Sequence, residues 1–396
     1  MSRRLVAAIG TILTLGTAGL SVCSGSPPSA GASPVAAPSV VTPLATSIAT
    51  TAGTWATVPM GRLDQAPNTF WQLLFLPTGT SSWSDEVGAT AVATNGGLVL
   101  AAGSRGIVVG VRPSNRLTFS PLIASSDAGR TWSNGLLSEG LAEHPQALAV
   151  DDTGQAVALV AVRGEGLTRV LLSAAGLSRW QTLATASSLA AVQGAKACGL
   201  GEITAVSLLA GSPLVGTSCA RPGVVGILAR RTGKWELIGP PLPSSLDRGR
   251  AEVLAMTTAA NTLTVLVAVS IGAADDLVAA WSADGGQYWR TSTALPVSEG
   301  LQLASVGPVS GDGLFVLMNR RAGADELDTV EGPGVPWTSL PSPPAGTATV
   351  AFPPGTTPEA LVVHDAALTV LDLTSASRTW VQSQMLSVPI QYGSSS

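Results

Sequence analysis

The sequence predicts an all-β protein in which four-stranded antiparallel units repeat around a ring. Tryptophans recur at nearly regular intervals, and the apolar residues beyond the N-terminus form runs of about five to eight residues separated by glycine, proline, aspartate and serine. Runs of this length suit strands and are much shorter than the ~18–20 residues of a membrane-spanning helix. A chain of 396 residues can form such a ring as a single domain.

Seven segments of the chain align on a strand, a polar turn and a tryptophan. The aligned tryptophans are Trp83, Trp132, Trp180, Trp235, Trp289, Trp337 and Trp380, and successive members are 49, 48, 55, 54, 48 and 43 residues apart. A period of about 50 residues indicates a repeated supersecondary unit with room for four short strands. We therefore predict a β-propeller of seven blades, with six blades as the alternative.

Strands can be placed within two of these periods. The runs are Ala89–Thr94, Leu98–Ala102 and Phe119–Ala124 in one period, and Glu252–Met256, Thr262–Val269 and Leu277–Trp281 in another, with a fourth strand after each tryptophan. The first segment, Phe70–Trp83, lacks its two inner strands, which we expect from the C-terminal Leu386–Gln391 or from the stretch around Trp55. A blade assembled from both ends of the chain would close the ring and remove exposed sheet edges.

Two of the turns, Ser125–Trp132 and Ser282–Trp289, share the pattern S-x-D-x-G-x-[T or aromatic]-W. An aspartate in such a turn can accept hydrogen bonds from the backbone just after it, the glycine supplies a positive φ, and hydroxyl groups hold the ends together. The tryptophan then returns the chain to a packed strand. We predict structural roles for Ser125, Asp127, Gly129, Thr131, Trp132, Ser282, Asp284, Gly286 and Trp289.

This pattern resembles the Asp-box (BNR) repeat of sialidase-like β-propellers, and the resemblance extends over about Trp55 to Trp380. It implies that the turns lie on the outer rim, away from the central funnel. Sialidases of that superfamily use three arginines, a tyrosine nucleophile with a glutamate, and an aspartate acid/base. Of the two tyrosines here, Tyr288 lies in a turn and Tyr392 in the C-terminal tail, and the F/Y-R-I-P type motif for the first arginine is absent. The resemblance therefore implies a non-catalytic member.

A glycosidase that uses two carboxylates is an alternative, because such a pair has no fixed sequence spacing. The candidates on loops between blades are Glu139 and Glu143 with His144, Asp247 with Arg248 and Arg250, and Glu299, and each can also be a solvated loop charge. The chain has two histidines, His144 and His364, and no Cys, His and Asp cluster with metal-ligand spacing. We predict neither a metal nor a cofactor.

Three arginines occur close together in one stretch of the sequence, which is therefore a candidate ligand surface. Arg105, Arg112 and Arg116 lie in the stretch Gly103–Leu117, interpreted as one loop of a chain with few cations. Three guanidinium groups could hold a carboxylate or an acidic glycan. Solubility and local ion pairing are the alternative role for these arginines.

The N-terminal residues have the order of a secretory signal: the charged Met1–Arg4, the apolar Leu5–Leu20, and then small residues. We expect residues 1–23 to be a signal peptide and the mature protein to be exported to the extracellular face of the cell membrane or the cell wall. Residues 24–50 are rich in Ser, Pro, Ala and Thr and predict a flexible tether. Residues 51–396 are the predicted β-propeller domain.

Cysteine usage agrees with export. Cys23 ends a Leu-Ser-Val-Cys stretch that resembles a bacterial lipobox, whose cysteine is lipidated. Since Val22 stands where a small residue is expected, ordinary cleavage near Ala30–Ala32 is the alternative. The chain has three cysteines, and we predict a disulfide between the other two, Cys198 and Cys219, with two buried free thiols as the alternative.

The net charge of −4, with 12% charged residues, gives no electrostatic case for nucleic-acid binding. We expect a monomer that contacts a membrane only through a lipid anchor and binds an envelope glycan or protein. The predicted function is non-catalytic binding or scaffolding in the cell envelope. A glycan-processing hydrolase and an assembly factor for a membrane complex are the alternatives.

Overall fold

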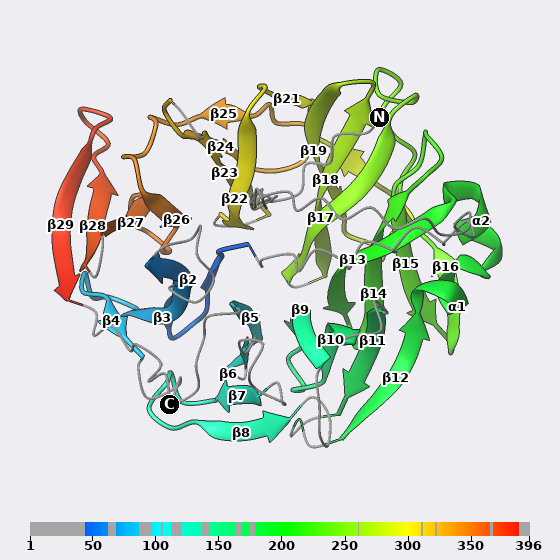
Figure 1. Ribbon diagram of the computed structural model, residues 1–396, viewed down its shortest axis with the longest axis horizontal. Coiled ribbons are helices and arrows are strands. Elements are labelled where there is room, and N and C mark those ends of the chain that lie inside the picture. The colour runs from blue at the N-terminus through cyan, green and yellow to red at the C-terminus, as the bar shows by residue number, and fades with distance from the viewer. Residues whose placement is uncertain are drawn as a thin grey trace, which may run out of the picture.

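The computed structural model describes residues 44–61, 69–86, 97–103, 106–111, 121–136, 143–162, 168–174, 177, 179–259, 261–309, 312–320, 323–364 and 367–387. Over these residues the chain forms seven consecutive four-stranded antiparallel meanders that surround a central axis (Figure 1). The predicted all-β propeller with four-stranded blades is therefore confirmed, and each meander is one blade.

The strands follow one another along the chain from the axis to the rim in every blade. Blade 1 contains β1 (Ser47–Ala49), β2 (Gly53–Gly61), β3 (Thr69–Pro77) and β4 (Ser84–Asp85); blade 2 contains β5 (Leu98–Gly103), β6 (Gly106–Val111), β7 (Pro121–Ser125) and β8 (Ser133–Leu136); blade 3 contains β9 (Glu143–Val150), β10 (Ala156–Val162), β11 (Thr168–Ser173) and β12 (Trp180–Thr185). Blade 4 contains β13 (Leu200–Leu209), β14 (Ser212–Cys219), β15 (Gly226–Arg231) and β16 (Lys234–Leu237).

The remaining three blades have the same order. Blade 5 contains β17 (Arg250–Ala259), β18 (Thr262–Ile271), β19 (Ala274–Ser282) and β20 (Arg290–Thr291), with β21 (Leu295–Val297) also paired to β19; blade 6 contains β22 (Leu301–Pro308), β23 (Leu314–Arg320), β24 (Glu326–Val330) and β25 (Thr338–Ser339); blade 7 contains β26 (Thr347–Ala351), β27 (Glu359–His364), β28 (Ala367–Leu373) and β29 (Trp380–Ser387). Blades 4 and 5 are joined into one sheet by a single pairing, Ser218 with Glu252.

Burial on both faces explains the near-continuous apolar runs of the inner strands. In β18, Leu263, Val265, Val267 and Val269 pack in the core between blades 4 and 5. The alternate residues Leu266 and Ala268 pack in the core between blades 5 and 6. Successive side chains of a strand point to opposite faces, so a strand between two neighbouring blades must be apolar at nearly every position.

Two short helices, which the sequence did not predict, connect blades 3 and 4. Helix α1 (Ala186–Ala190) starts with a capping box made by Thr185 and Ser188, and α2 (Gln193–Cys198) ends at Gly199, whose φ is 60°. No helix in the described part of the chain has both the length and the apolar character needed to cross a membrane.

The repeated tryptophans connect neighbouring blades. Several of them donate their indole Nε1–H to an oxygen of the preceding blade, where blade 7 counts as the blade before blade 1. These bonds run from Trp83 to Glu359 Oε2 (2.6 Å), from Trp289 to the carbonyl of Ile238 (2.8 Å), from Trp337 to that of Thr293 (3.0 Å) and from Trp380 to that of Pro341 (3.2 Å). The sequence period therefore reflects a repeated contact between blades as well as a repeated blade.

The ring is closed by side chains between blades 1 and 7. The Trp83 indole bonds Glu359, and the backbone of Trp83 exchanges two hydrogen bonds with the Gln384 amide, at 2.8 and 3.0 Å. Of the two sources expected for the inner strands of blade 1, the stretch around Trp55 is confirmed, because it forms β2. Leu386 belongs to β29 of blade 7, so the described residues form no blade from both ends of the chain. Nine backbone pairs between β2 and β3 make the local hairpin sufficient to complete blade 1.

The segment before β2 lies along the inner strands of blades 6 and 7. Ala45 forms a parallel bridge with Ser305 of β22, whose hydroxyl donates to the Ala45 carbonyl at 2.9 Å, and the Ser47 hydroxyl donates to the carbonyl of Val350 in β26 at 3.0 Å. All four residues are buried. Figure 1 shows this segment, in blue, entering the centre of the ring. The predicted tether, residues 24–50, therefore extends too far along the chain, because Ser47–Ala49 already form a strand of blade 1. The composition of this segment does not show that Ala45 and Ser47 are buried against blades 6 and 7.

Strand β6 is a second correction to the placement of the strands. The stretch Gly103–Leu117 was interpreted as one loop, but Gly106–Val111 pairs with β5 on one side and β7 on the other. Its Ile-Val-Val core is a β-branched run that suits a buried strand. The flanking glycines and arginines hid this signal. The predicted strand Ala89–Thr94 lies outside the described residues.

Candidate functional site

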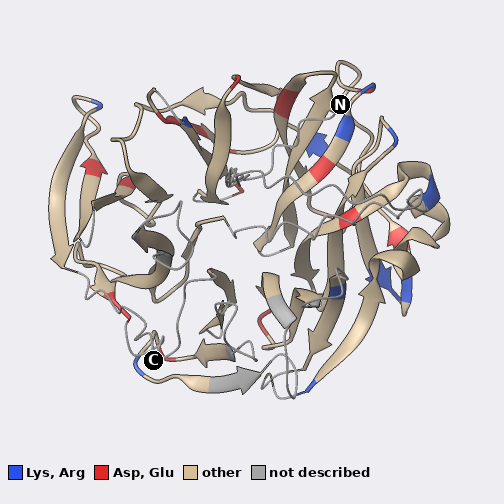
Figure 2. Cartoon of the chain, viewed as in Figure 1, with Lys and Arg blue, Asp and Glu red and all other residues tan. Residues whose placement is uncertain are grey.

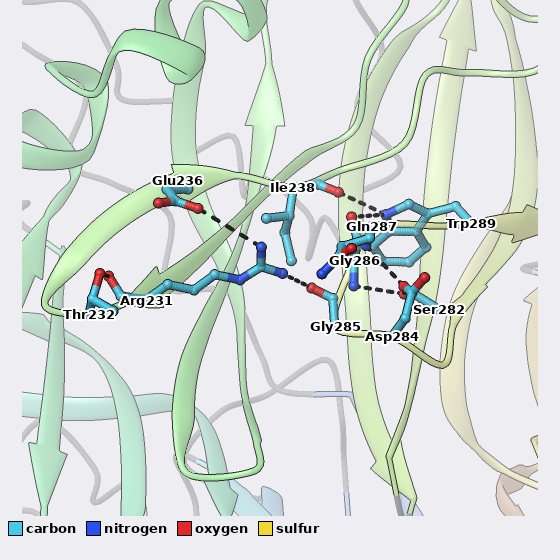
Figure 3. A network of polar contacts seen from close by, with 10 residues as sticks. All are labelled: Arg231, Thr232, Glu236, Ile238, Ser282, Asp284, Gly285, Gly286, Gln287 and Trp289. Carbon is cyan, nitrogen blue, oxygen red and sulfur yellow. Dashed lines mark hydrogen bonds and ion pairs between the residues drawn. The ribbon is translucent and has the colours of Figure 1, made fainter.

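The second aspartate turn, Ser282–Trp289, holds its shape through hydrogen bonds to Asp284 and Ser282 (Figure 3). The Asp284 carboxylate accepts from the backbone N–H of Gln287 (3.0 Å) and of Tyr288 (2.9 Å), and from the Ser282 hydroxyl (2.9 Å). The Ser282 hydroxyl in turn accepts from the N–H of Gly286 at 2.7 Å. The backbone bond from Tyr288 is the main cause of a lowered pKa at Asp284.

The first aspartate turn, Ser125–Trp132, repeats this arrangement in blade 2. Asp127 accepts from the backbone N–H of Thr131 (2.9 Å) and from its hydroxyl (2.6 Å), and Ser125 Oγ accepts from the N–H of Gly129 (2.8 Å). The two bonds from Thr131 lower the pKa of Asp127 to about 2. Both carboxylates are therefore occupied within their turns, and we assign them a structural role.

The second turn is fixed against blade 4. Trp289 donates to the Ile238 carbonyl, and a Cβ placed on Gly286 would lie 2.6 Å from Cδ1 of the same isoleucine. The Arg231 guanidinium donates to the carbonyl of Gly285 and lies 3.9 Å from a Glu236 carboxylate oxygen. Figure 3 shows these contacts bridging the β15–β16 hairpin of blade 4, with the residue that follows it, and the turn of blade 5.

A groove of about 440 Å³ lies beside this turn at the rim between blades 4 and 5. It is lined by Pro240, Pro241, Leu242, Pro243, Gln287, Tyr288, Trp289 and Thr291. Tyr288 is 80% exposed, which makes it the most exposed large apolar side chain in the described part of the chain. Its backbone is held by Asp284, so the groove presents an accessible aromatic ring on a fixed turn.

The proline wall of the groove is rigid and poor in hydrogen-bond donors. Proline has a fixed φ and no backbone N–H. The carbonyl of Pro240 is taken by the N–H of Val225 (3.0 Å), and that of Pro243 by the N–H of Leu246 (2.7 Å). The Trp289 indole N–H of the lining is occupied by the Ile238 carbonyl, and the other polar side-chain groups are those of Gln287, Thr291 and Tyr288, none of which carries a charge at neutral pH. The groove is therefore suited to an uncharged ligand that packs against an aromatic face.

A second groove, of about 530 Å³, lies between blades 1, 2 and 7. Its lining consists of Ala49, Thr50, Thr51, Thr78, Ala102, Gly103 and Pro354. These side chains are short and include no aromatic ring or charge. They provide fewer contacts for orienting a ligand than the groove at Tyr288, which we take as the candidate site.

The candidate anion site is not tested, because Arg105, Arg112 and Arg116 lie outside the described residues, as does Cys23. Arg105 precedes Gly106 and Arg112 follows Val111 in the sequence, and these two neighbours are the opposite ends of β6. The single loop on which the site was argued therefore does not exist as expected.

The loop acids proposed for a hydrolase remain candidates without a geometric match. Glu139 and the side chains of Glu143 and His144 are outside the described part of the structure. Asp247 and Glu299 are exposed. Among the described residues, no three His, Cys, Asp or Glu side chains group as metal ligands would.

Two of the acids with raised pKa values, Asp328 and Glu359, have hydrogen-bond partners that indicate structural roles. Burial raises the pKa of Asp328, whose carboxylate accepts from the Ser339 hydroxyl at 2.6 Å. Burial also raises the pKa of Glu359, the partner of Trp83. Asp85 has its pKa raised to about 6 by burial and by the charge of Glu86. Asp328, Glu359 and Asp85 lie in blades 6, 7 and 1, away from the lining of the groove at Tyr288.

Cys198 and Cys219 are joined by a disulfide, with 5.0 Å between their Cα atoms. Cys198 ends α2 and Cys219 ends β14, so the bond attaches the helical connection to blade 4. The segment between β14 and β15 begins at this end of blade 4. Within it, Val224 pairs with Pro241 of the groove's proline wall.

The comparisons with known proteins agree with the fold. No family model and no curated protein matches the sequence. A protein of Bacteroides uniformis described as a candidate 6-phosphogluconolactonase is 8% identical, with 84% of this chain and 96% of that chain covered and a TM-score of 0.51. A protein of Lactobacillus plantarum is 11% identical, with coverages of 85% and 96% and a TM-score of 0.51.

The six-bladed, fucose-recognising lectin of Aleuria aurantia is also similar, at 14% identity, coverages of 76% and 95% and a TM-score of 0.43, a value too low to carry an argument. Identities in this range show the fold alone. The fold therefore defines this chain as a β-propeller.

Proposed function

We propose that this protein is an exported, non-catalytic binding module of the cell envelope, and that the groove at Tyr288 holds its ligand. The observation that carries the proposal is the exposed Tyr288 ring, which stands beside three prolines and Trp289 on a turn fixed by Asp284. Ligand sites in proteins are concave and largely apolar, with aromatic walls and a few placed polar groups. A preorganised aromatic anchor also binds without a large ordering cost.

We propose a neutral glycan as the ligand class. Sugar rings present C–H groups that pack on an aromatic face, while Gln287, Thr291 and the Tyr288 hydroxyl can bond hydroxyl groups at its edge. The absence of an ionised side chain among the lining residues favours an uncharged sugar over an acidic one. The buried N-terminal segment along the inner strands of blades 6 and 7 further favours the rim over the centre of the ring.

The test is a glycan array probed with the full chain and with two variants of the groove. Tyr288→Ala removes the ring, and loss of a central aromatic anchor worth about 2 kcal/mol weakens binding ~30-fold. Tyr288→Phe keeps the ring and should retain most of the affinity. Because Tyr288 is 80% exposed, neither change should affect folding. Val335→Ala, at another exposed apolar residue, is the matched control.

Three outcomes would overturn this proposal. Cleavage of an arrayed glycan would show a hydrolase. Binding that survives Tyr288→Ala but is lost in the Arg105/Arg112/Arg116→Ala variant would move the site to those arginines. Binding to proline-rich or other peptides, with no glycan retained, would show a protein-binding module or an assembly factor.

A further inference from the structure

The disulfide between Cys198 and Cys219 lies where the helical connection from blade 3 meets blade 4. Both sulfurs are buried, since Cys198 is 0% and Cys219 is 4% exposed. A Cβ placed on Gly226, the first residue of β15, would lie 2.9 Å from Sγ of Cys219 and 3.1 Å from that of Cys198. The disulfide therefore contacts α2, the end of β14 and the start of β15 together.

One path of contacts leads from the disulfide to the proline wall of the groove through the backbone after Cys219. Arg221, two residues further on, donates its N–H to the Cys198 carbonyl at 3.0 Å. Residues 223–225 of the same segment then make three backbone contacts with the proline wall. They are the bond from the Leu242 N–H to the Gly223 carbonyl (2.9 Å), the pairing of Val224 with Pro241, and the bond from the Val225 N–H to the Pro240 carbonyl (3.0 Å).

A second path leads through α2. This helix has six residues and no side-chain hydrogen bond at its N-cap, so it has little stability of its own. A Cβ placed on its Gly194 would lie 2.7 Å from Cβ of Leu237, the last residue of β16. Ile238, which follows, accepts the indole bond of Trp289. The disulfide therefore holds α2 against the strand end from which the proline wall begins.

The two paths meet at the same wall of the groove. The opposite wall is the turn that carries Tyr288, and bonds to Asp284 within the turn hold it. The proline wall is a link between blades, and its prolines have no N–H with which to form backbone bonds of their own. A wall that becomes mobile must be ordered again when a ligand binds, which lowers affinity. Loss of the disulfide is therefore expected to weaken binding while the blades persist.

The residues around both cysteines favour oxidation before the fold is complete. Lys196 precedes Cys198 by two residues, Arg221 follows Cys219 by two, and Figure 2 shows the positive charge on α2. Neighbouring cations favour the thiolate, which is the form that attacks a disulfide. In the folded protein both sulfurs are buried, so reagents in solution reach them slowly. The redox state of the pair is therefore set while the chain folds.

We propose that the groove at Tyr288 binds its ligand tightly only in the oxidised protein, because the Cys198–Cys219 disulfide holds the proline wall in place. The bond forms by exchange with a disulfide oxidant, RSSR, in the compartment to which the chain is exported. One S–S bond forms between the two cysteines, RSSR is reduced to two RSH, and the two thiol protons pass to these products. This inference rests on the proposed function and adds a condition to it: a chain that folds in a reducing compartment has the blades without the ordered groove.

The test compares two forms of the full chain that differ only in this bond. Both carry Cys23→Ala, so that no other thiol takes part, and one also carries Cys198→Ala/Cys219→Ala. The chain without Cys23→Ala substitution of its other two cysteines is the parent of this comparison and is prepared oxidised. Far-UV circular dichroism establishes that each form is folded.

Hydrogen exchange of the ligand-free protein tests the effect on the wall. The N–H groups of Val225 and Leu242 should exchange at least ~10-fold faster in the double-alanine variant than in the parent. The Leu373 N–H, which donates to the Pro358 carbonyl in blade 7 at 2.9 Å, is the matched control and should not change. Equal protection of Val225 and Leu242 in the two forms would overturn the proposal. An increase that Leu373 shares equally would also overturn it, because the disulfide would then stabilise the whole ring.

Glycan binding tests the effect on the ligand. The double-alanine variant should bind the arrayed glycans that the parent retains at least ~10-fold more weakly. Parent refolded in dithiothreitol should behave like the variant, and refolding with oxidised glutathione should restore binding. Dithiothreitol added to the folded, oxidised parent should leave binding unchanged, because both sulfurs are buried.

Equal affinities of the oxidised and reduced proteins would overturn the proposal. A double-alanine variant and a reduced parent that both fail to fold would overturn it as well, because the bond would then be required by the blades and not by one wall. A parent that retains no glycan would contradict the proposed function, and hydrogen exchange at Val225 and Leu242 would then decide the role of the disulfide by itself.

Discussion

The bond between Trp83 and Glu359 is expected to make a large contribution to the stability of the closed ring. Trp83 Nε1 donates to Glu359 Oε2 at 2.6 Å, and the two residues are only 2% and 8% exposed. Trp83→Phe removes the donor and leaves the carboxylate in a buried site without it. A hydrogen bond to a charged group contributes about 1.5–3 kcal/mol, and the smaller ring adds about 1 kcal/mol of lost packing. We expect a loss of about 2.5–4 kcal/mol in the free energy of unfolding.

Glu359→Gln removes the charge at this position but keeps an oxygen that can accept the hydrogen bond from Trp83. Burial raises the pKa of Glu359 above its ordinary 4.5; the Trp83 bond opposes this shift and the charge of Asp372 adds to it. A folded-state pKa above the ordinary value means that this carboxyl favours folding most below pH 4.5 and less as the pH rises through the folded-state pKa. The parent chain should therefore lose stability relative to Glu359→Gln over this interval.

Urea unfolding followed by far-UV circular dichroism measures both effects. In the Glu359→Gln background, Trp83→Phe should lose only a neutral hydrogen bond, so its cost should fall by about 1 kcal/mol or more. Trp337→Phe, which removes a bond to a backbone carbonyl, should cost the same in both backgrounds. Two results together would refute this account of the Trp83–Glu359 bond. One is an equal loss of unfolding free energy on Trp83→Phe in both backgrounds, and the other is the same pH dependence of stability in the parent and in Glu359→Gln.

Three other predictions follow from the turns and the disulfide. Asp127→Asn should be less stable than the parent at pH 7, and the difference should disappear below about pH 2. A carboxyl whose pKa is lowered from 3.8 to about 2 stabilises the fold above pH 3.8 and loses that effect as the pH falls through 2; acid titration of unfolding checks this. Gly286→Ala should cost more stability than Gly285→Ala, since both have positive φ but only the first meets a neighbouring side chain at 2.6 Å; thermal unfolding compares the two. Replacing Cys198 and Cys219 together with Ala should cost about 3 kcal/mol for a bridge across 21 residues, measured by urea unfolding under oxidising conditions.

The repeat of the fold was predictable because every blade makes the same local demands. A strand between two blades is apolar along its length, and the tryptophan after each turn meets the blade before it. As a result, apolar strands and tryptophans recur about every 50 residues, and this period can be found in a single sequence. Strand β6 could not be recognised because glycines and arginines around it masked its short β-branched run, Ile107–Val109.

The candidate groove could not be predicted, because its two walls come from different blades. The prolines after β16 and the turn that carries Tyr288 are each visible in the sequence, but no sequence spacing shows that they meet. In the sequence alone, Tyr288 is notable only as one of two tyrosines that could serve as a nucleophile, and its place in a turn argues against that role. The sequence does contain one signal: the turn of blade 5 has the aromatic Tyr288 at the position where the matching turn of blade 2 has Thr131.

The connection between each tryptophan and the preceding blade sets an order for folding. Blades 2 to 7 can complete their contacts as soon as they leave the ribosome, since the blade before each one already exists. Blade 1 cannot, because the partner of Trp83 is Glu359, 276 residues later in the chain. Contacts between residues so distant in the sequence form slowly, because the entropy of closing the loop is lost before the contact is gained. Until synthesis of blade 7 ends, blade 1 keeps an uncovered apolar face, so the nascent chain is most vulnerable to aggregation at its oldest blade.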